Sequence, residues 1–555
     1  MFAGLLLLVH STATGQSLPT LQITNQHGRA VITAKPYSVF ASGYSLQMTT
    51  SLSLPVVWLD VTNIQVDGSA SVPMVYPYMF FRLVPVPPIF QFAIFYNLDL
   101  EMNPGATMFI NAPVFSNGGL WSGSTVLTFS NTVSAVGLVT NTVGDPFCAG
   151  YNGSGKSTYA DGPPVPGAPP LDFGFYGSFT NSIGVRNLFN LPPPTYAMGT
   201  PAAYSPVGLT YFANEVDLYL TNYPNGTNWG ALVPRGTNMT LYYQDPANGP
   251  GNYLTQVPYD FYLVTNRGTH TIMATNVVIF IYKEVPNSIS NIWYAGYSFL
   301  TNDVFVDWRE GWNNGSGPPK TVQAVQLDLR LFNLWLTNTG PNGGSVFNNQ
   351  CLLPSHKAHP IDSIFIYNSV PLTGTTLPAV RIINGGMLPS QAGFHGFTLA
   401  TPMPLYIYGD YNASNSFGSS LGQNSTTYTW PAALMADSIT ILSGNWNDAV
   451  TTKKPAAINT TVNAAIIAGI VPSTNGIYSG GVENFLRALE SWTSSTLWYN
   501  GSIVAMYPSA YATNHWQLAG NYYNAPVRRW AYDTNFNSYM GLPPLTPLVL
   551  NHVTP

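Results

Sequence analysis

Residues 98–143 read LDLEMNPGATMFINAPVFSNGGLWSGSTVLTFSNTVSAVGLVTNTV, and this stretch decides the fold class. Brief apolar runs are cut by turn sequences at Asn103-Pro104-Gly105, Asn117-Gly118-Gly119 and Ser122-Gly123-Ser124. Short strands with turns about every ten to twenty residues are typical of a β-solenoid, in which each rung buries its inward side chains against the next. A β-sandwich or a meander is the alternative. The sequence therefore predicts a mainly β protein with a β-helix or solenoid-like body, an inserted mixed lobe and a few short helices.

The composition also favours strands over helices. Charged residues make up 7% of the chain, against roughly 25% in an ordinary soluble domain. Long amphipathic helices carry Glu, Lys and Arg on their wet face, whereas Tyr, Val, Ile and Thr favour strands. With 34 Tyr and few charges, this chain solvates its surface with neutral hydrogen-bonding groups.

Shifts in texture along the chain predict six segments. Two apolar patterns at near-helical spacing predict helices, one through Val322, Val325, Leu329, Phe332 and Leu336 and one near 482–492 through Val482, Phe485, Leu486, Leu489 and Trp492. The segments are 1–16, a signal or truncated N-terminal segment; 17–90, a strand-rich lead-in; 91–145, a first β-solenoid-like part; 146–360, a Pro/Gly-rich insertion and mixed α/β lobe; 361–512, a second β-solenoid-like part; and 513–555, a C-terminal extension.

Residues 150–158, GYNGSGKST, spell the phosphate-binding pattern of a P-loop. That loop requires a buried strand before it and a helix after it. Pro146 interrupts the upstream stretch, and the downstream TYADGPPVPGAPP cannot begin a helix because its prolines remove N–H donors. The sequence therefore predicts no nucleotide binding and a solvated Lys156.

Charge and cysteine content exclude other classes. The net charge is −5 and the 18 Lys and Arg form no basic stripe, so no nucleic-acid partner is expected. The only cysteines, Cys148 and Cys351, are compatible with one disulfide or with two free thiols. The leucine-rich start MFAGLLLLV has the length of a signal-peptide core, although a truncated pilin-like helix is the alternative. Both versions predict an extracytoplasmic protein, at the cell surface, in the outer envelope or secreted.

Several short patterns suggest chemistry, and each has a simpler structural interpretation. Gly418-Ser419-Ser420-Leu421-Gly422 spells a nucleophile elbow but lies in an Asn/Ser-rich run. Cys351, His356, His359 and Asp362 resemble metal ligands, yet the paired spacing of a strong zinc motif is missing. The prediction is therefore no catalytic, cofactor-binding or metal-binding residue.

Carboxylates offer the remaining catalytic hypothesis. Asp410, Asp437 and Asp448, with Arg381 nearby, would suit a glycan-active site on adjacent rungs. Aspartates at strand ends more often accept backbone N–H bonds and fix turns. Two further clusters are interpreted as structural anchors: Asp307-Trp308-Arg309-Glu310, with a local Arg–carboxylate pair, and Arg528-Arg529-Trp530, with arginine stacked on an aromatic ring.

Several phrases between residues 80 and 545 resemble a known group of proteins. Among them are FQFAIFYNLDLEMNPGATMFINAPVFSNGGLW, HPIDSIFIYNSVPLT, PAALMADSITILSGNW and YYNAPVRRWAYDTNF. They resemble large bacterial exported proteins of the type IV pilus-assembly, minor-pilin-associated kind. This resemblance implies an extracytoplasmic, β-helix-rich protein without an established catalytic site.

The expected function is therefore that of a noncatalytic structural or assembly protein of a pilus-like or other cell-surface apparatus. Its expected partners are other pilus or envelope proteins, and no cofactor is predicted. The alternative is a carbohydrate-binding or polysaccharide-degrading β-helix protein, because 14% aromatic residues and neutral polar groups also suit sugar faces.

Overall fold

The computed structural model of the protein describes residues 88–141, 155–168, 299–311, 318–337, 362–389, 396–414, 429–450, 453–474, 480–514 and 522–547, and shorter pieces elsewhere. The chain divides into two compact units. Unit 1 comprises Met1–Ile89, Pro169–Gly174 and Pro547–Pro555, and unit 2 comprises Phe90–Ala168 and Phe175–Thr546.

Unit 1 contains antiparallel strands only, among its described residues. Alternation along its strands lets Ala30 and Ile32 bury their side chains on one face. The first sheet holds β1 (Thr20–Gln26), β2 (Arg29–Lys35) and β5 (Ser69–Pro73), the second holds β4 (Leu59–Asp60), β3 (Tyr44–Thr49) and β6 (Phe80–Pro85), and β17 (Leu171–Asp172) pairs with β41 (Leu550–Asn551).

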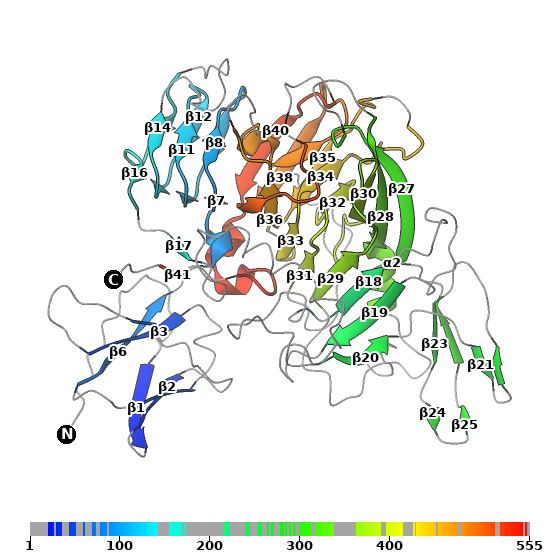
Figure 1. Ribbon diagram of the computed structural model, residues 1–555, viewed down its shortest axis with the longest axis horizontal. Coiled ribbons are helices and arrows are strands. Elements are labelled where there is room, and N and C mark those ends of the chain that lie inside the picture. The colour runs from blue at the N-terminus through cyan, green and yellow to red at the C-terminus, as the bar shows by residue number, and fades with distance from the viewer. Residues whose placement is uncertain are drawn as a thin grey trace. The chain divides into compact units, whose positions relative to one another are not determined.

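Unit 2 is dominated by a twelve-stranded sheet, most of whose strands are labelled in Figure 1. Ten of its strands pair in parallel and the last two continue antiparallel. In spatial order it holds β16 (Val165–Pro166), β13 (Val133–Ala135), β10 (Val114–Ser116), β7 (Ile94–Tyr96), β39 (Ile503–Pro508), β36 (Ala465–Ile470), β33 (Ala432–Ala436), β31 (Phe397–Ala400), β29 (Ser363–Asn368), β18 (Leu218–Asn222), β19 (Met239–Gln244) and β20 (Tyr253–Val257).

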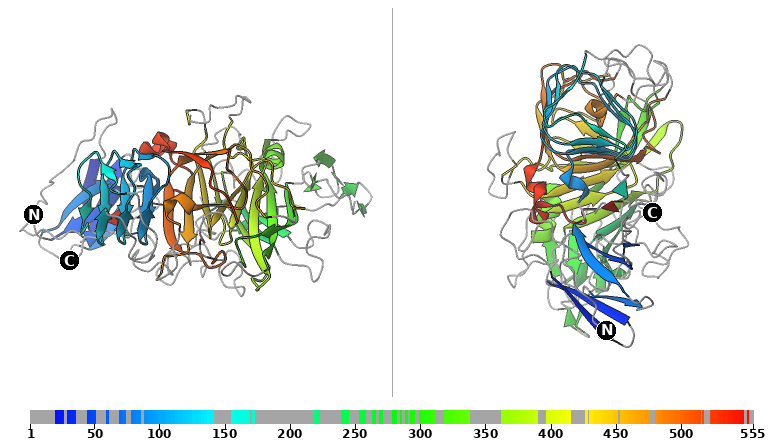
Figure 2. Two further views of the ribbon diagram at one scale, coloured as in Figure 1. Left: turned by 90° about the horizontal axis from the view of Figure 1, so that it is seen from above. Right: turned by 90° about the vertical axis from the view of Figure 1, so that its left-hand side faces the viewer.

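Between β7 and β39 the spatial order of this sheet departs from chain order. Strand β39 pairs in parallel with β7, so that Ile503 lies opposite Ile94. The N–H of Ile503 donates to the carbonyl oxygen of Ala93 at 2.9 Å. The strands of residues 94–166 therefore extend the sheet beyond those of residues 363–508, as the blue and orange strands of Figure 2 show.

One row of buried aliphatic side chains runs through this β7–β39 junction. Each member lies opposite the next in the strand register, so the row is continuous across segments that are far apart in sequence. Burial of such side chains is the main stabilising term of the ladder. The row is Ile364, Leu399, Leu434, Ile466, Ile503, Ile94, Val114 and Val133.

The remaining ladders of unit 2 accompany the large sheet. Between residues 94 and 159 the chain returns to three ladders in turn, adding one parallel strand to each. The three-stranded sheets are β8 (Leu100–Met102), β11 (Leu120–Ser122) and β14 (Val139–Asn141); β9 (Met108–Ile110), β12 (Leu127–Phe129) and β15 (Thr158–Tyr159); and β35 (Thr460–Asn463), β38 (Thr496–Gly501) and β40 (Val527–Tyr532).

A six-stranded sheet completes the larger ladders. One of its faces carries a cluster that includes Phe305, Leu377, Tyr406, Trp446 and Leu489. In order, the sheet holds β27 (Leu300–Asp307), β28 (Lys320–Asp328), β30 (Thr376–Ile383), β32 (Leu405–Tyr408), β34 (Ile439–Leu442) and β37 (Leu486–Ala488).

Short strand pairs and a few helical turns make up the rest of unit 2. With the sheets described above, the described chain is mainly β, as the sequence predicts, and its larger sheets are mostly parallel. The strand pairs are β21 (Leu263–Thr265) with β22 (Gly268–His270), β23 (Val278–Ile281) with β26 (Ile292–Ala295), and β24 (Glu284–Val285) with β25 (Ser288–Ile289); the helices are α2 (Leu329–Thr337) and the short 3-10 turns η8 (Val482–Asn484), η9 (Thr534–Asn537) and η10 (Tyr539–Gly541), while η2 (Ile89–Gln91) begins where the two units meet in sequence.

Both helix predictions need correction. The prediction of a helix near 482–492 is wrong, because the chain there forms η8 and then strand β37, which pairs in parallel with β34. Every residue of β37 is buried, and a strand buried on both faces shows the same apolar density as a helix. The central helix begins at Leu329, whereas Val322 and Val325 lie on strand β28.

The described residues include no helix with the length and apolar character of a membrane span.

Candidate functional site

Arg381 and Asp448, two members of the proposed glycan-active group, do meet in the structure. The Arg381 guanidinium donates to both Asp448 carboxylate oxygens, at 2.6 and 2.9 Å, and also binds Asp303. Its Nε donates to Gln326 at 2.8 Å, and its Cζ lies 4.7 Å from the centre of the Phe305 ring. The Arg381 guanidinium is therefore engaged by protein groups and links strands of the six-stranded sheet to the Asp448 segment.

Asp410 and Asp437 lie elsewhere and hold separate turns. The Asp437 carboxylate accepts N–H bonds from Ala510, Tyr511 and Ala512 at 2.6, 3.1 and 2.8 Å. Asp410 accepts one from Thr461 at 2.8 Å. The three aspartates of the hypothesis thus bind different partners instead of converging on one cleft.

A buried ionic network forms around the segment Asp307–Glu310. Glu310 pairs with the Arg487 guanidinium and also accepts the N–H of Asn514 at 3.2 Å. Asp307 accepts the N–H groups of Arg309 and Glu310 at 2.7 and 3.0 Å and the Tyr406 hydroxyl at 2.6 Å. The predicted local pair inside this segment is wrong, because the partner of Glu310 comes from strand β37.

Arg309 enters the same region without a carboxylate partner among the described residues. Its residue exposure is 3%, and its Nε and Nη1 have no hydrogen-bond partner in the described part of the chain. Its Cζ lies 5.6 Å from the centre of the Tyr522 ring. Burial lowers the pKa of Arg309, and the positive charge of Arg487 lowers it further.

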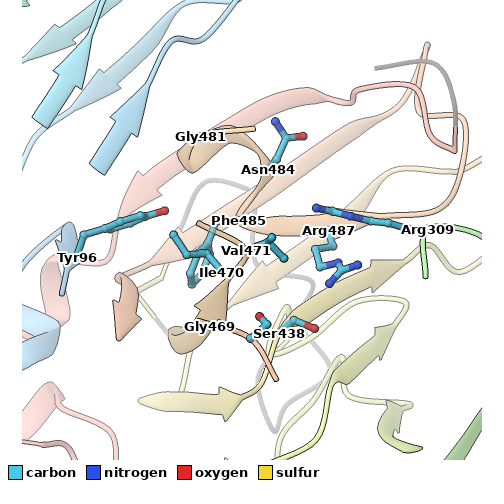
Figure 3. Close-up of a pocket in the computed structure, with 11 residues that line it drawn as sticks. Tyr96, Arg309, Ser438, Gly469, Ile470, Val471, Gly481, Asn484, Phe485 and Arg487 are labelled. Atoms are coloured by element: carbon cyan, nitrogen blue, oxygen red, sulfur yellow. The ribbon is translucent and has the colours of Figure 1, made fainter. Parts of the chain in front are cut away.

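Arg309 and Arg487 line a small, partly open cavity, drawn in Figure 3. In this view the two guanidinium groups lie side by side, with Asn484 above them and Ser438 below. Tyr96, from strand β7, bounds the cavity on the opposite side. The site thus combines residues from both strand-rich segments and lies beside the β7–β39 junction. The remaining lining residues are Gly469, Ile470, Val471, Gly481, Phe485 and Ser509.

Sequence reasoning missed Arg487 and did not assign Arg309 to a cavity. The available signal was a charged residue inside the apolar run NFLRALESW, because an arginine in a buried strand requires an acidic partner. The sequence does not name that partner, which lies 177 positions away.

Glu490, three residues after Arg487, is a buried acid whose pKa differs from the ordinary value. Its carboxylate accepts the Ser443 N–H at 2.6 Å and the Ser443 hydroxyl at 2.7 Å. Burial raises the pKa of Glu490 to about 7, against the opposing effect of these two hydrogen bonds. Glu483 behaves similarly, with a pKa of about 7 raised by burial.

Substitution of Glu490 by Gln is expected to change the pH dependence of stability. Between the ordinary value of 4.5 and about 7, the folded state keeps a proton that the unfolded state has released, so this group's contribution is full below pH 4.5 and falls as pH rises through 7. Relative to wild type, the free energy of unfolding of E490Q should rise by about 3 kcal/mol between about pH 4 and pH 8. Urea unfolding at both pH values measures this, with exposed Asp161→Asn as control; equal pH profiles for E490Q and wild type would contradict it.

The Arg528–Trp530 prediction is confirmed, since Arg528 Cζ lies 5.7 Å from the centre of the Trp530 ring. Among the other sequence candidates, Cys148, Cys351, His356, His359 and residues 418–422 lie outside the described residues, and Asp362 is described. No group of three or more His, Cys, Asp or Glu side chains suited to a metal ion occurs in the described part of the chain.

The P-loop string is described from Gly155 onward. The Gly155 N–H donates to the Gly123 carbonyl oxygen at 3.0 Å, and the Ser157 N–H donates to Asn141 Oδ1 at 2.7 Å. Thr158 then begins strand β15, whereas a P-loop requires a helix there. Lys156 is exposed, as predicted.

We expect no nucleotide binding at this string. Titration of ATP and Mg²⁺ into the purified protein should give no saturable heat signal. The substitution Lys156→Ala should leave the free energy of unfolding within about 0.5 kcal/mol of wild type, as for other exposed positions. Micromolar ATP binding that disappears in K156A would contradict this prediction.

Comparisons with other proteins do not assign the chain to a family. No protein-family model, no curated protein and no solved structure matches it. The resemblance to pilus-assembly proteins therefore stays an expectation.

Proposed function

We propose that the protein is a noncatalytic, exported structural or assembly protein of a type IV pilus-like or other cell-surface apparatus. We further propose that its strand-rich body is one β-solenoid whose first part stacks on the end of its second. This first part extends beyond the expected 91–145, because β15 and β16 add to its ladders. The observation that carries the proposal is the unbroken aliphatic row from Ile364 to Val133 through the β7–β39 junction. A stack of rungs stabilised by nearest-neighbour contacts gives a stiff body suited to a structural role.

The charged groups support this role. The candidate catalytic acids and their arginine serve internal contacts: Asp448 and Asp303 bind Arg381, and Asp437 binds three backbone N–H groups. Groups that hold loops and strands in this way are typical of structural networks. With 7% charged residues, the surface depends on neutral polar groups, a composition that also fits the expected export.

Fractionation of the native host tests the proposal. We expect the protein in the sheared surface or envelope fraction, together with appendage proteins, and we expect sequencing of its mature N-terminus to separate a cleaved signal from a pilin-like start. Deletion of the gene should reduce surface appendages, and re-expression should restore them. An uncleaved chain in the cytosol, with appendages unaffected by the deletion, would refute the proposal.

Carbohydrate binding is the second candidate, favoured by an aromatic cavity next to the β7–β39 junction. Its lining includes Tyr499, Trp530 and Tyr532, beside Phe109, whose side chain is 55% exposed. Aromatic rings of this kind suit the apolar faces of sugars. Selective binding on a glycan array that is lost in Trp530→Ala would favour this candidate over the assembly role.

A further inference from the structure

The guanidinium of Arg309 is the starting point, because it is buried and has no acidic partner among the described residues. Both neighbouring acids are engaged: Glu310 by Arg487, and Asp307 by backbone N–H groups and the Tyr406 hydroxyl. The negative charge of Glu310 acts on Arg309, but the Nε and Nη1 groups of Arg309 donate to no group in the described part of the chain. Buried N–H donors without an acceptor cost free energy, and protein interiors normally provide an acceptor for them.

Two further polar groups at the cavity lack a partner in the described part of the chain. These are the Nε of Arg487 and the hydroxyl of Ser438, both buried. Figure 3 shows the Arg309 side chain reaching from the bend after β27 toward the cavity, with Arg487 beside it and Ser438 on the lower wall. Three donors from separate elements therefore surround one small space.

The described residues that line this space include no Asp or Glu. The opposite wall of the cavity includes Ile470, Val471 and Phe485, which provide apolar contact and no charge.

We propose that this cavity is a binding site for a small carboxylate ligand, with Arg309 as its counter-charge and the Ser438 hydroxyl and Arg487 Nε as further donors. Guanidinium groups bind carboxylates through strong charge-assisted hydrogen bonds. A carboxylate adds one negative charge beside Glu310, whereas a phosphate dianion would add two. The ligand's remaining atoms lie against the apolar wall. This inference is independent of the assembly role proposed above.

Titration of the purified full chain with sodium acetate tests the site. Calorimetry at about pH 7 and constant ionic strength, with sodium chloride as the exchanged salt, should show saturable binding at one site. Arg309→Met should raise the Kd for acetate about tenfold or more, and Ser438→Ala should raise it by a smaller factor. The melting temperature should rise with acetate in wild type and stay constant in R309M.

Matched controls separate this site from nonspecific charge effects. Arg529→Met removes an arginine from an exposed position and should leave acetate binding unchanged. If R309M does not fold, S438A alone tests the cavity, because it removes only a hydroxyl. No saturable acetate binding, or equal affinity in wild type and both variants, would overturn the proposal. Saturable binding of inorganic phosphate but not of acetate would overturn the carboxylate assignment.

Discussion

Replacing Arg487 with Met is expected to lower the free energy of unfolding by about 3–5 kcal/mol, the usual cost of leaving a buried charge without its partner. Arg487 pairs with Glu310, and both residues are buried. Its Nη1 also donates to the Ala512 carbonyl oxygen at 3.0 Å, so the variant loses a link to the turn after β39. Burial already raises the pKa of Glu310, and Arg487 opposes that effect. Without the arginine, Glu310 should protonate more readily, and the loss should shrink as pH falls.

Urea unfolding of a matched set measures this effect. Glu310→Gln combined with R487M removes both charges, so this double variant should recover a large part of the loss. Arg529→Met is the control at an exposed position and should stay within about 0.5 kcal/mol of wild type. A loss below about 1 kcal/mol in R487M alone would show that the pair is not the buried interaction described here.

Substitution of Gly501 by Ala is expected to cost about 3 kcal/mol or more, at the upper end for overpacked cores. A Cβ at this position would lie 1.8 Å from the Ala464 carbonyl oxygen and 2.8 Å from the Tyr499 hydroxyl. The Tyr499 hydroxyl lies 3.0 Å from Ala464 O and 2.9 Å from Ser502 O and can donate its one proton to either, so the backbone cannot shift without disturbing these contacts. Relief would move the start of β39 and disturb its pairing with β7.

Gly374→Ala is the matched control, because a Cβ there would meet no atom within 4 Å. Thermal unfolding compares the two variants, and hydrogen exchange locates the damage. In G501A, faster exchange is expected at Ile503, whose N–H bonds Ala93 across the β7–β39 junction, and at Asn97, whose N–H bonds Ala505. Equal stability of G501A and G374A would contradict the close contact.

Local chemistry made several features predictable. The turn sequences and β-branched runs of residues 98–143 predict short strands, and the structure places strands β8 to β14 there. Prolines after Lys156 excluded the helix of a P-loop, and a strand stands in its place. Each of these inferences depends on residues within a few positions of one another.

The helix prediction at 482–492 was wrong because strand β37 and its flanking residues are buried on both faces. Val482, Leu486 and Leu489 recur at helical spacing, yet β37 adds to a sheet whose two faces are covered. The spacing of apolar residues shows which side of a helix or strand faces solvent. When neither side faces solvent, this spacing no longer distinguishes a helix from a strand.

The sequence by itself determined the strand-rich character, the neutral polar surface and the exposure of Lys156, because these follow from local propensity and composition. Only the tertiary structure decided that β7 pairs with β39, that Glu310 pairs with Arg487, and that the Nε and Nη1 of Arg309 have no hydrogen-bond partner among the described residues. Apolar strands such as β7 (IFY) and the start of β39 (IVA) could pair with many other apolar strands. Likewise, a charged residue in an apolar run does not show which residue will be its partner. The choice is made by the packing of the whole chain, where register and burial are satisfied together.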